Sequence, residues 1–155
     1  MPWINSTHLQ TIAEAVLNSN NKHSISVQAS TKNLAEVRDF VADHASKFGF
    51  NKDDVADIRL AVDEAFTNII EHAYQNDEKE SVKITLRYKG RHFDISLFDS
   101  GKSFSMVDYK EPDIKEKIKQ KKRGGVGVYL IKNLMDDVKY LHKDDKNEIR
   151  MTKKC

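Results

Sequence analysis

The sequence predicts an α+β domain in which helices lie on one face of a mostly antiparallel sheet. Segments of alternating apolar and polar residues arrive in neighbouring pairs, as hairpins do, rather than alternating singly with helices. Other segments carry apolar residues at helical spacing and supply the helices. A chain of 155 residues, 39% hydrophobic and 32% charged, is long enough to build one such core.

The N-terminal residues are expected to form an arm that precedes the domain. Residues 7–17 have the spacing of a short amphipathic helix, and the polar run at 18–22 has the composition of a loop. We divide the chain into this arm, residues 1–23, and a domain over residues 24–155. The arm helix either packs at the domain edge or serves as a docking or dimer-forming segment.

A strand and two helices are predicted to open the domain. Residues 24–29 alternate polar and apolar positions, as a strand does. The first helix starts at a Ser30 or Thr31 cap and stops at Gly49, and the second runs from Asn51 or Asp53 through Tyr74. The apolar face of the first helix consists of Leu34, Val37, Phe40, Val41 and Ala45.

Two more strands are predicted over residues 81–88 and 92–99, with Lys89-Gly90 as the hairpin turn between them. Residues 101–123 contain Pro112, carry many charges and show no sustained apolar period. A segment of that length without structure inside a compact domain is typical of a functional loop.

The C-terminal part is predicted to contain one helix and two closing strands. The helix begins in the glycine-rich sequence GGVGVYLIKNLMDDV at residues 124–138, and the strands cover residues 138–143 and 147–154.

Composition excludes several classes of function. The net charge of +2 indicates no bulk attraction to nucleic acid, and the basic run at 117–123 adjoins glycines rather than a recognition helix. No segment approaches the roughly 20 apolar residues of a membrane span, and no signal peptide is visible. The single cysteine, Cys155, favours a reducing compartment. We therefore expect a cytoplasmic protein without direct nucleic-acid or membrane binding.

Two glycine-rich segments partly match familiar phosphate-binding motifs. Gly101-Lys102-Ser103 resembles the end of a P-loop, but the required earlier glycine would fall at Ser96, within a predicted strand. The run from Gly124 to Gly127 lacks the preceding strand of a dinucleotide-binding motif. This run either presents backbone N–H groups to a phosphate at a helix N-terminus or only permits a tight entry into the helix.

A polar row lies along the second predicted helix. Glu64, Asn68 and His72 follow one another at i, i+4 positions beside the apolar stripe of that helix. The carboxamide oxygen of Asn68 is a hard neutral ligand suited to Mg²⁺, and the Glu64 carboxylate is suited to accept a proton. Each residue alone is more typical of an ordinary solvated helix flank, whereas an asparagine within a helix is intrinsically unfavourable and calls for a reason.

Three motifs in order resemble the nucleotide-binding boxes of the GHKL ATPase superfamily: DEAFTNIIEHAY at 63–74, DSGKSF at 99–104 and RGGVGVYLI at 123–131. The chain is most similar to the stand-alone serine/threonine kinases that act as anti-sigma factors. The resemblance covers residues 24–154 and implies the two-layer Bergerat α/β sandwich, with ATP and Mg²⁺ as ligands.

The resemblance assigns roles to individual residues of this sequence. It implies that Glu64 is the catalytic base, that Asn68 coordinates Mg²⁺, that Asp99 recognises the adenine amino group and that Gly101 lets the base lie close to the backbone. Residues 105–123 correspond to the ATP lid. The glycines expected beside the triphosphate are Gly124, Gly125 and Gly127. The other residues expected to bind the nucleotide are His72, Phe104, Arg123, Val126 and Val128.

Two positions depart from the family pattern. A Gly-Thr pair often precedes the last strand of the family, with the threonine near adenine, but this chain has Lys146-Asn147 there. The lid is also rich in lysine, and the basic residues 121–123 either meet phosphate oxygens or form a solvated face.

The resemblance implies a kinase that phosphorylates a STAS-type anti-anti-sigma protein, sequesters a sigma factor and forms a homodimer. An ATP-binding regulatory module without phosphoryl transfer is the alternative. A histidine-kinase ATPase domain fits less well, because only the short helix around His8 precedes the domain.

Overall fold

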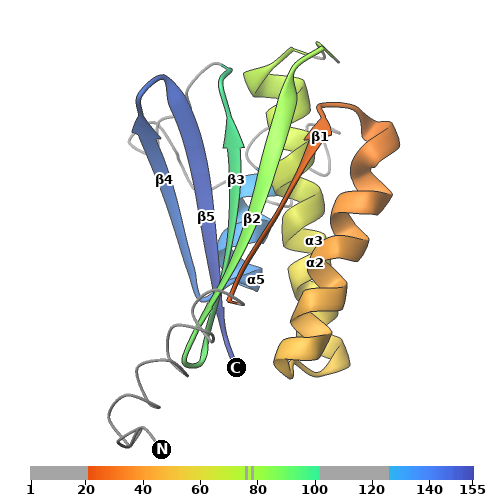
Figure 1. Ribbon diagram of the computed structural model, residues 1–155, viewed down its shortest axis with the longest axis vertical. Coiled ribbons are helices and arrows are strands. Elements are labelled where there is room, and N and C mark those ends of the chain that lie inside the picture. Colours follow the sequence, from red (N-terminus) through yellow and green to blue (C-terminus); the bar gives the residue numbers. More distant parts are fainter. Residues whose placement is uncertain (1–20, 76, 78, 102–125) are drawn as a thin grey trace, which may run out of the picture.

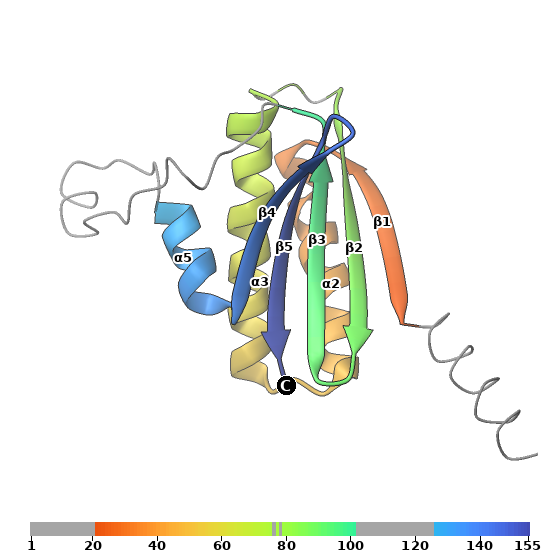
Figure 2. The ribbon, with the colours of Figure 1, turned by 90° about the vertical axis from the view of Figure 1, so that its left-hand side faces the viewer.

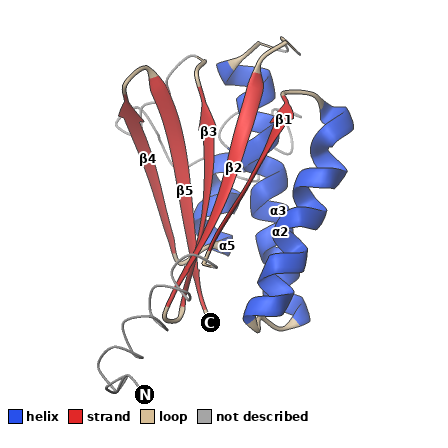
Figure 3. Cartoon of the chain, viewed as in Figure 1, coloured by secondary structure: helices blue, strands red, loops and turns tan. Residues whose placement is uncertain are grey.

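The computed structural model describes residues 21–75, 77, 79–101 and 126–155. Its strands form one sheet in the order β1-β2-β3-β5-β4, and every neighbouring pair is antiparallel. The helices pack on one face of this sheet, so the domain is the expected two-layer sandwich (Figures 1 and 3). The strands are β1 Lys22–Gln28, β2 Ser81–Lys89, β3 His92–Asp99, β4 Asp137–Lys143 and β5 Lys146–Lys154. The helices are η1 Thr31–Asn33, α2 Leu34–Phe48, α3 Lys52–Asn68, η2 Ile69–Ala73 and α5 Val126–Leu134.

The two central strands bury the side chains that face the helices. The fully buried members are Val82, Ile84 and Leu86 of β2 and Phe93, Ile95 and Leu97 of β3, each 0% exposed. Removing one such side chain from water contributes about 1.5–3 kcal/mol, and a one-residue slip would turn the whole set to the other face. The register is therefore strongly fixed. Asp99, two residues beyond Leu97, lies on the same helix-facing side of β3.

The predicted helix boundaries at the start of the domain are confirmed. The Ser30 hydroxyl accepts a hydrogen bond from the Lys32 N–H and opens the short 3₁₀ turn η1 before α2. Gly49, with φ of 116°, ends α2 in the left-handed conformation that glycine adopts without strain. The Asn51 side chain accepts a hydrogen bond of 2.8 Å from the Asp54 N–H and caps α3.

The end of the second long helix differs from the prediction of one α-helix through Tyr74. The α-helix α3 ends at Asn68, and the chain continues as the π-helix η2, in which the Tyr74 N–H donates to the Ile69 carbonyl at 3.0 Å. The wider turn places the consecutive residues Ile69 and Ile70 in the buried layer together with Tyr74. Single π-helical turns inside longer helices are frequent at functional sites.

The two hairpins have tight turns, and one of them differs from the prediction. Lys89 pairs with His92, so the first turn consists of Gly90 and Arg91 rather than Lys89-Gly90. The second turn, Asp144-Asp145, joins β4 to β5 with positive φ at both residues, 54° and 60°. Such two-residue turns match the twist of paired strands. They therefore fix which residues lie opposite each other across β4 and β5.

The C-terminal helix α5 packs beside α3 (Figure 2). It ends at Leu134, so Asp136 and Asp137, which the prediction included in the helix sequence, lie beyond the helix, and β4 begins at Asp137. The predicted helix at residues 7–17 and the predicted loop after Gly101 lie outside the described residues. Within the described part of the chain, no helix is both long and apolar enough to cross a membrane.

Candidate functional site

The first and third sequence motifs meet where α5 begins against α3. Glu64 and Asn68 are half-buried on α3, and Gly127 is the second residue of α5. A methyl group placed on Gly127 would lie 2.9 Å from Glu64 Oε2 and 3.1 Å from Asn68 Nδ2. The missing side chain of Gly127 therefore leaves room for both polar side chains at the N-terminal turn of α5. That turn carries backbone N–H groups without helical partners and a partial positive charge.

The first and second motifs meet further along the same helical segment, where η2 ends. A methyl group on Gly101 would lie 2.9 Å from the Ala73 Cβ and would collide with the Ala73 carbonyl group. Any larger residue at this position would push the chain after β3 away from η2. Gly101 is thus required by close packing of two backbone segments, independently of any ligand.

Tyr74 reinforces this second contact with its hydroxyl group. The hydroxyl accepts a hydrogen bond of 2.7 Å from the Ser100 N–H and donates one of 2.8 Å to the Ser81 carbonyl. Tyr74 is buried, and burial is the main reason that its pKa is raised above the ordinary value of 10.0. The neutral hydroxyl therefore stays available as donor and acceptor, tying the end of β3 to the start of β2.

Asp99 is held in place by hydrogen bonds to one of its two carboxylate oxygens. Its Oδ1 accepts from the Gly101 N–H at 2.9 Å and from Asn147 Nδ2 at 2.9 Å. None of the hydrogen bonds among the described residues uses Oδ2. Asp99 itself is only 8% exposed. A nearly buried carboxylate with one oxygen occupied can accept a hydrogen bond from a ligand through the other.

The other residues that the sequence predicts to bind the nucleotide lie at several different places. His72 lies on η2 with its side chain 70% exposed, and its Nε2 is 4.0 Å from Glu71 Oε2. Val128 is buried in α5, and Val126 is the first residue of that helix. The structure thus brings Glu64 and Asn68 to Gly127, and Asp99 to Gly101, whereas His72 takes part in neither contact. Phe104, Arg123, Gly124 and Gly125 lie outside the described residues.

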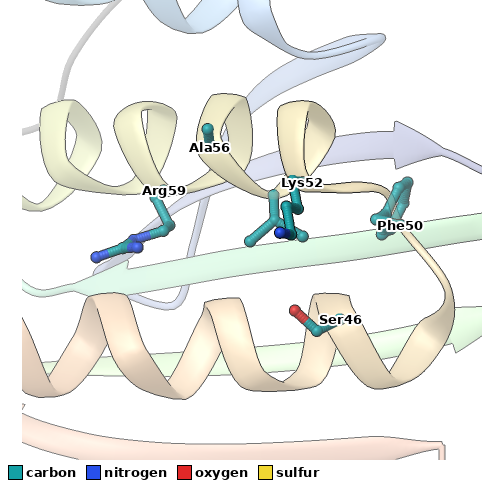
Figure 4. Close-up of a pocket in the computed structure, with 6 residues that line it drawn as sticks. Ser46, Phe50, Lys52, Ala56 and Arg59 are labelled. Carbon is teal, nitrogen blue, oxygen red and sulfur yellow. The ribbon is translucent and has the colours of Figure 1, made fainter.

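A groove of about 250 Å³ lies elsewhere on the helical layer, between the end of α2 and the start of α3 (Figure 4). Its lining combines Phe50 and Val55 with the cationic side chains of Lys52 and Arg59. None of the residues predicted to bind nucleotide lines this groove, which is near the beginning of α3 rather than its end. The groove lies apart from the candidate site, so its residues serve as a reference when nucleotide binding is measured.

Two residues of the site were not predicted to belong to it. Tyr74 closes the first motif, but the sequence pattern predicts only that a helix ends there. Its position directly before a loop is the one signal in the sequence that points to a wider role. Asn147 was noted only as a departure from the family pattern. Its hydrogen bond to Asp99 joins residues 48 positions apart, which no local pattern reveals.

Comparisons with known proteins identify the family of this chain. Residues 27–153 match the histidine kinase-like ATPase domain family. The serine-protein kinase RsbW of Bacillus thuringiensis is 34% identical over 136 residues, which cover 85% of this chain and 84% of that protein.

Two solved structures share the fold. A chain of the SiaB-SiaC complex from Pseudomonas aeruginosa has a TM-score of 0.65 at 12% identity, with 96% of this chain and 99% of that chain covered. The RsbU and RsbW domains of Rv1364c from Mycobacterium tuberculosis give 0.60 at 18% identity, with 86% of this chain and 31% of that longer chain covered. The chain described here therefore belongs to the histidine kinase-like ATPase family, in its serine-protein kinase branch.

Proposed function

We propose that this protein binds ATP between its three motifs and transfers the γ-phosphate to a serine or threonine hydroxyl of a partner protein. The observation that carries the proposal is the contact of Gly127 with Glu64 and Asn68. It places a carboxylate and a carboxamide beside the N-terminal turn of a helix. Such a turn favours phosphate groups through its free N–H groups and its partial charge.

In this proposal the phosphates lie beside Asn68 at the end of α3, and the base lies further along the chain, beside Ala73 at the end of η2. Asp99 and Gly101 receive the adenine near Ala73, where Asp99 Oδ2 accepts from the exocyclic amino group. The N-terminal turn of α5 receives the triphosphate near Asn68. Residues 105–123 form the ATP lid, and Phe104, Arg123, Gly124 and Gly125 keep the nucleotide contacts expected for them from the sequence.

The residues present fit a magnesium ion of the kind that accompanies a nucleotide. No cluster of three or more His, Cys, Asp or Glu side chains within the described ranges could hold a metal alone. Magnesium bound with phosphates needs only one or two protein oxygens, and Asn68 Oδ1 is such a ligand. Bound there, the ion would neutralise the negative charge that develops on the phosphates during transfer.

Glu64 acts as the general base in this proposal. Its carboxylate accepts the proton of the acceptor hydroxyl while the hydroxyl oxygen attacks the γ-phosphorus. The bond from that phosphorus to the β,γ-bridging oxygen breaks, and ADP leaves with the bond's electron pair. Gly127 supports this step by leaving the space that the Glu64 carboxylate occupies.

The partners are proposed from the relatives. The relative named RsbW is a serine-protein kinase, and one solved chain of this fold comes from a two-protein complex. We propose that the acceptor is a STAS-type anti-anti-sigma protein, that the chain sequesters a sigma factor and that it forms a homodimer. The single cysteine, Cys155, is exposed, which agrees with a reducing, cytoplasmic setting.

Labelled ATP provides the test of phosphoryl transfer. The wild-type protein, Glu64→Gln and Glu71→Gln are each incubated with γ-labelled ATP, Mg²⁺ and candidate STAS proteins. Glu71 is the matched control, because it is an exposed glutamate on η2. We expect the wild type and Glu71→Gln to label the partner equally, and Glu64→Gln to label it about a hundredfold more slowly or worse.

ATP affinity, measured in parallel, separates the alternatives. Glu64→Gln should retain ATP binding while losing transfer. Undiminished labelling by Glu64→Gln would show that Glu64 is not the base. Tight ATP binding by the wild type with no labelling of any STAS candidate would favour a regulatory module instead of a kinase.

A further inference from the structure

Asp99, Asn147 and His142 form a row across three strands at one end of the sheet. Asp99 of β3 pairs with Asn147 of β5, and Asn147 pairs in turn with His142 of β4. Residues directly opposite one another on neighbouring strands project from the same face. The row therefore reaches from the Asp144-Asp145 turn to the proposed adenine end of the nucleotide site.

The chemistry of the neighbouring groups determines how the Asn147 carboxamide is oriented. One of its terminal atoms lies 2.9 Å from Asp99 Oδ1 and 3.0 Å from the Gly101 carbonyl oxygen. Carboxylate and carbonyl oxygens only accept hydrogen bonds, so that atom is the NH₂ nitrogen. The Asn147 oxygen then faces His142 Nδ1 at 2.8 Å, and this ring nitrogen carries the proton.

We infer that Asn147 is a positioning residue for Asp99 and sets the preference of the site for a base with an exocyclic amino group. This inference rests on the proposed function, in which Asp99 receives adenine. Asn147 and the Gly101 N–H both donate to Oδ1 and fix the carboxylate from one side. Oδ2 is thereby left as the acceptor for a ligand, and an amino group is the donor it fits.

The residue type matters for this role. The Asn147 NH₂ group donates to Asp99 and to the Gly101 carbonyl at the same time, and so ties the carboxylate to the segment that follows β3. A threonine, which the family pattern places here, has one hydroxyl hydrogen and can donate to only one of these acceptors. His142 completes the row by holding the amide oxygen.

The test compares ATP with purine-riboside triphosphate, which has the same ring system without the amino group. Affinities are measured by titration calorimetry with Mg²⁺ for the wild type, Asn147→Ala, Asn147→Thr and the neighbouring exposed control Lys146→Ala. A hydrogen bond to a charged group corresponds to about a tenfold to hundredfold preference for ATP, which we expect for the wild type and for Lys146→Ala.

Asn147→Ala should reduce this preference to about threefold or less, with unchanged affinity for the analogue, because only the amino-group contact is lost. Asn147→Thr keeps one donor, so its preference for ATP should lie between those of the wild type and Asn147→Ala. The positioning role is contradicted if Asn147→Ala keeps the wild-type preference for ATP, or if it loses affinity equally for both nucleotides. Neither result contradicts the proposed function. A wild type that binds neither nucleotide contradicts the proposed function and this inference with it.

Discussion

Gly127 lies so close to Glu64 that a methyl group in place of its hydrogen would come 2.9 Å from the carboxylate Oε2. The two residues are 63 positions apart in sequence, and the contact joins α5 to the helix that carries the proposed base and metal ligand. This contact gives a physical reason for a glycine at position 127 of the third motif.

Gly127→Ala tests this contact. Alanine favours the helical conformation over glycine by about 0.5–1 kcal/mol, so the melting temperature should stay level or rise. The new methyl group displaces the flexible Glu64 side chain, and transfer to the partner should fall about tenfold to hundredfold. Thermal unfolding and labelled-ATP assays measure the two effects. A variant that transfers phosphate at the wild-type rate would contradict the assigned geometry.

Asn68→Ala tests the proposed metal ligand. Loss of the carboxamide oxygen should reduce ATP affinity in Mg²⁺ to about the value that the wild type shows in EDTA, because one of very few protein ligands is gone. Calorimetric titration with and without Mg²⁺ gives the comparison. Asn133→Ala is the matched control, since Asn133 is an exposed asparagine on α5. A variant as Mg²⁺-dependent as the wild type would exclude Asn68 as a ligand.

Tyr74→Phe tests the hydrogen bonds that connect η2 with β2 and β3. The substitution leaves the Ser100 N–H and the Ser81 carbonyl without their partner, at a cost of about 1–3 kcal/mol in the free energy of unfolding. Urea denaturation measures this loss. Tyr129→Phe is the control, because the Tyr129 hydroxyl makes no hydrogen bond within the described part of the chain. Equal stability of Tyr74→Phe and Tyr129→Phe would show that the hydrogen bonds of the Tyr74 hydroxyl do not stabilise the fold.

The environment of His44 predicts that the folded protein loses stability in mild acid. Burial lowers the pKa of His44 below 6.5, with further lowering by His23 and Lys47 and an opposing effect of Asp43. Its Nδ1 lies 2.5 Å from the hydroxyl of Tyr88, whose pKa burial raises to about 12. Tyr88 therefore stays protonated and donates to the neutral imidazole.

The direction of the effect follows from proton binding. Between the lowered folded pKa and 6.5, the unfolded chain binds more protons than the folded one, so the free energy of unfolding decreases as the pH falls through this range. Urea denaturation at pH 7.5 and 5.5 should show a smaller decrease for His44→Gln than for the exposed control His92→Gln. The same decrease in both variants would contradict the prediction.

Local patterns in the sequence were sufficient for most of the fold. The alternation in β2 and β3 predicted two strands with one buried face. Gly49 predicted where α2 ends, and the alternatives Asn51 and Asp53 predicted where α3 begins. These features depend on neighbouring residues, whose spacing and capping chemistry a sequence displays directly. The π-helical turn after Asn68 was not predictable in this way, because it depends on how Ile69, Ile70 and Tyr74 pack in three dimensions.

The candidate site was predictable as a set of motifs but not as a set of contacts. The sequence placed Glu64 and Asn68 on one row of a helix and identified Asp99 and Gly127 in two other motifs. Which of them touch is decided by the packing of α5 on α3 and by the register of β3 against β5, both of which join distant positions. Asn147 shows this most clearly, since only its pairing with Asp99 explains its place in the site.

The central proposal is that one nucleotide spans the two contacts along the α3–η2 segment. The most direct measurement is a titration of ¹⁵N-labelled protein with Mg²⁺ and a non-hydrolysable ATP analogue, followed by amide NMR signals. We predict saturable shifts at both ends of the site, at Gly101 and the Asn147 side-chain NH₂ and at Gly127, with none at Ala56 and Arg59 in the distant groove. Shifts confined to the groove, or to only one end of the site, would contradict the account.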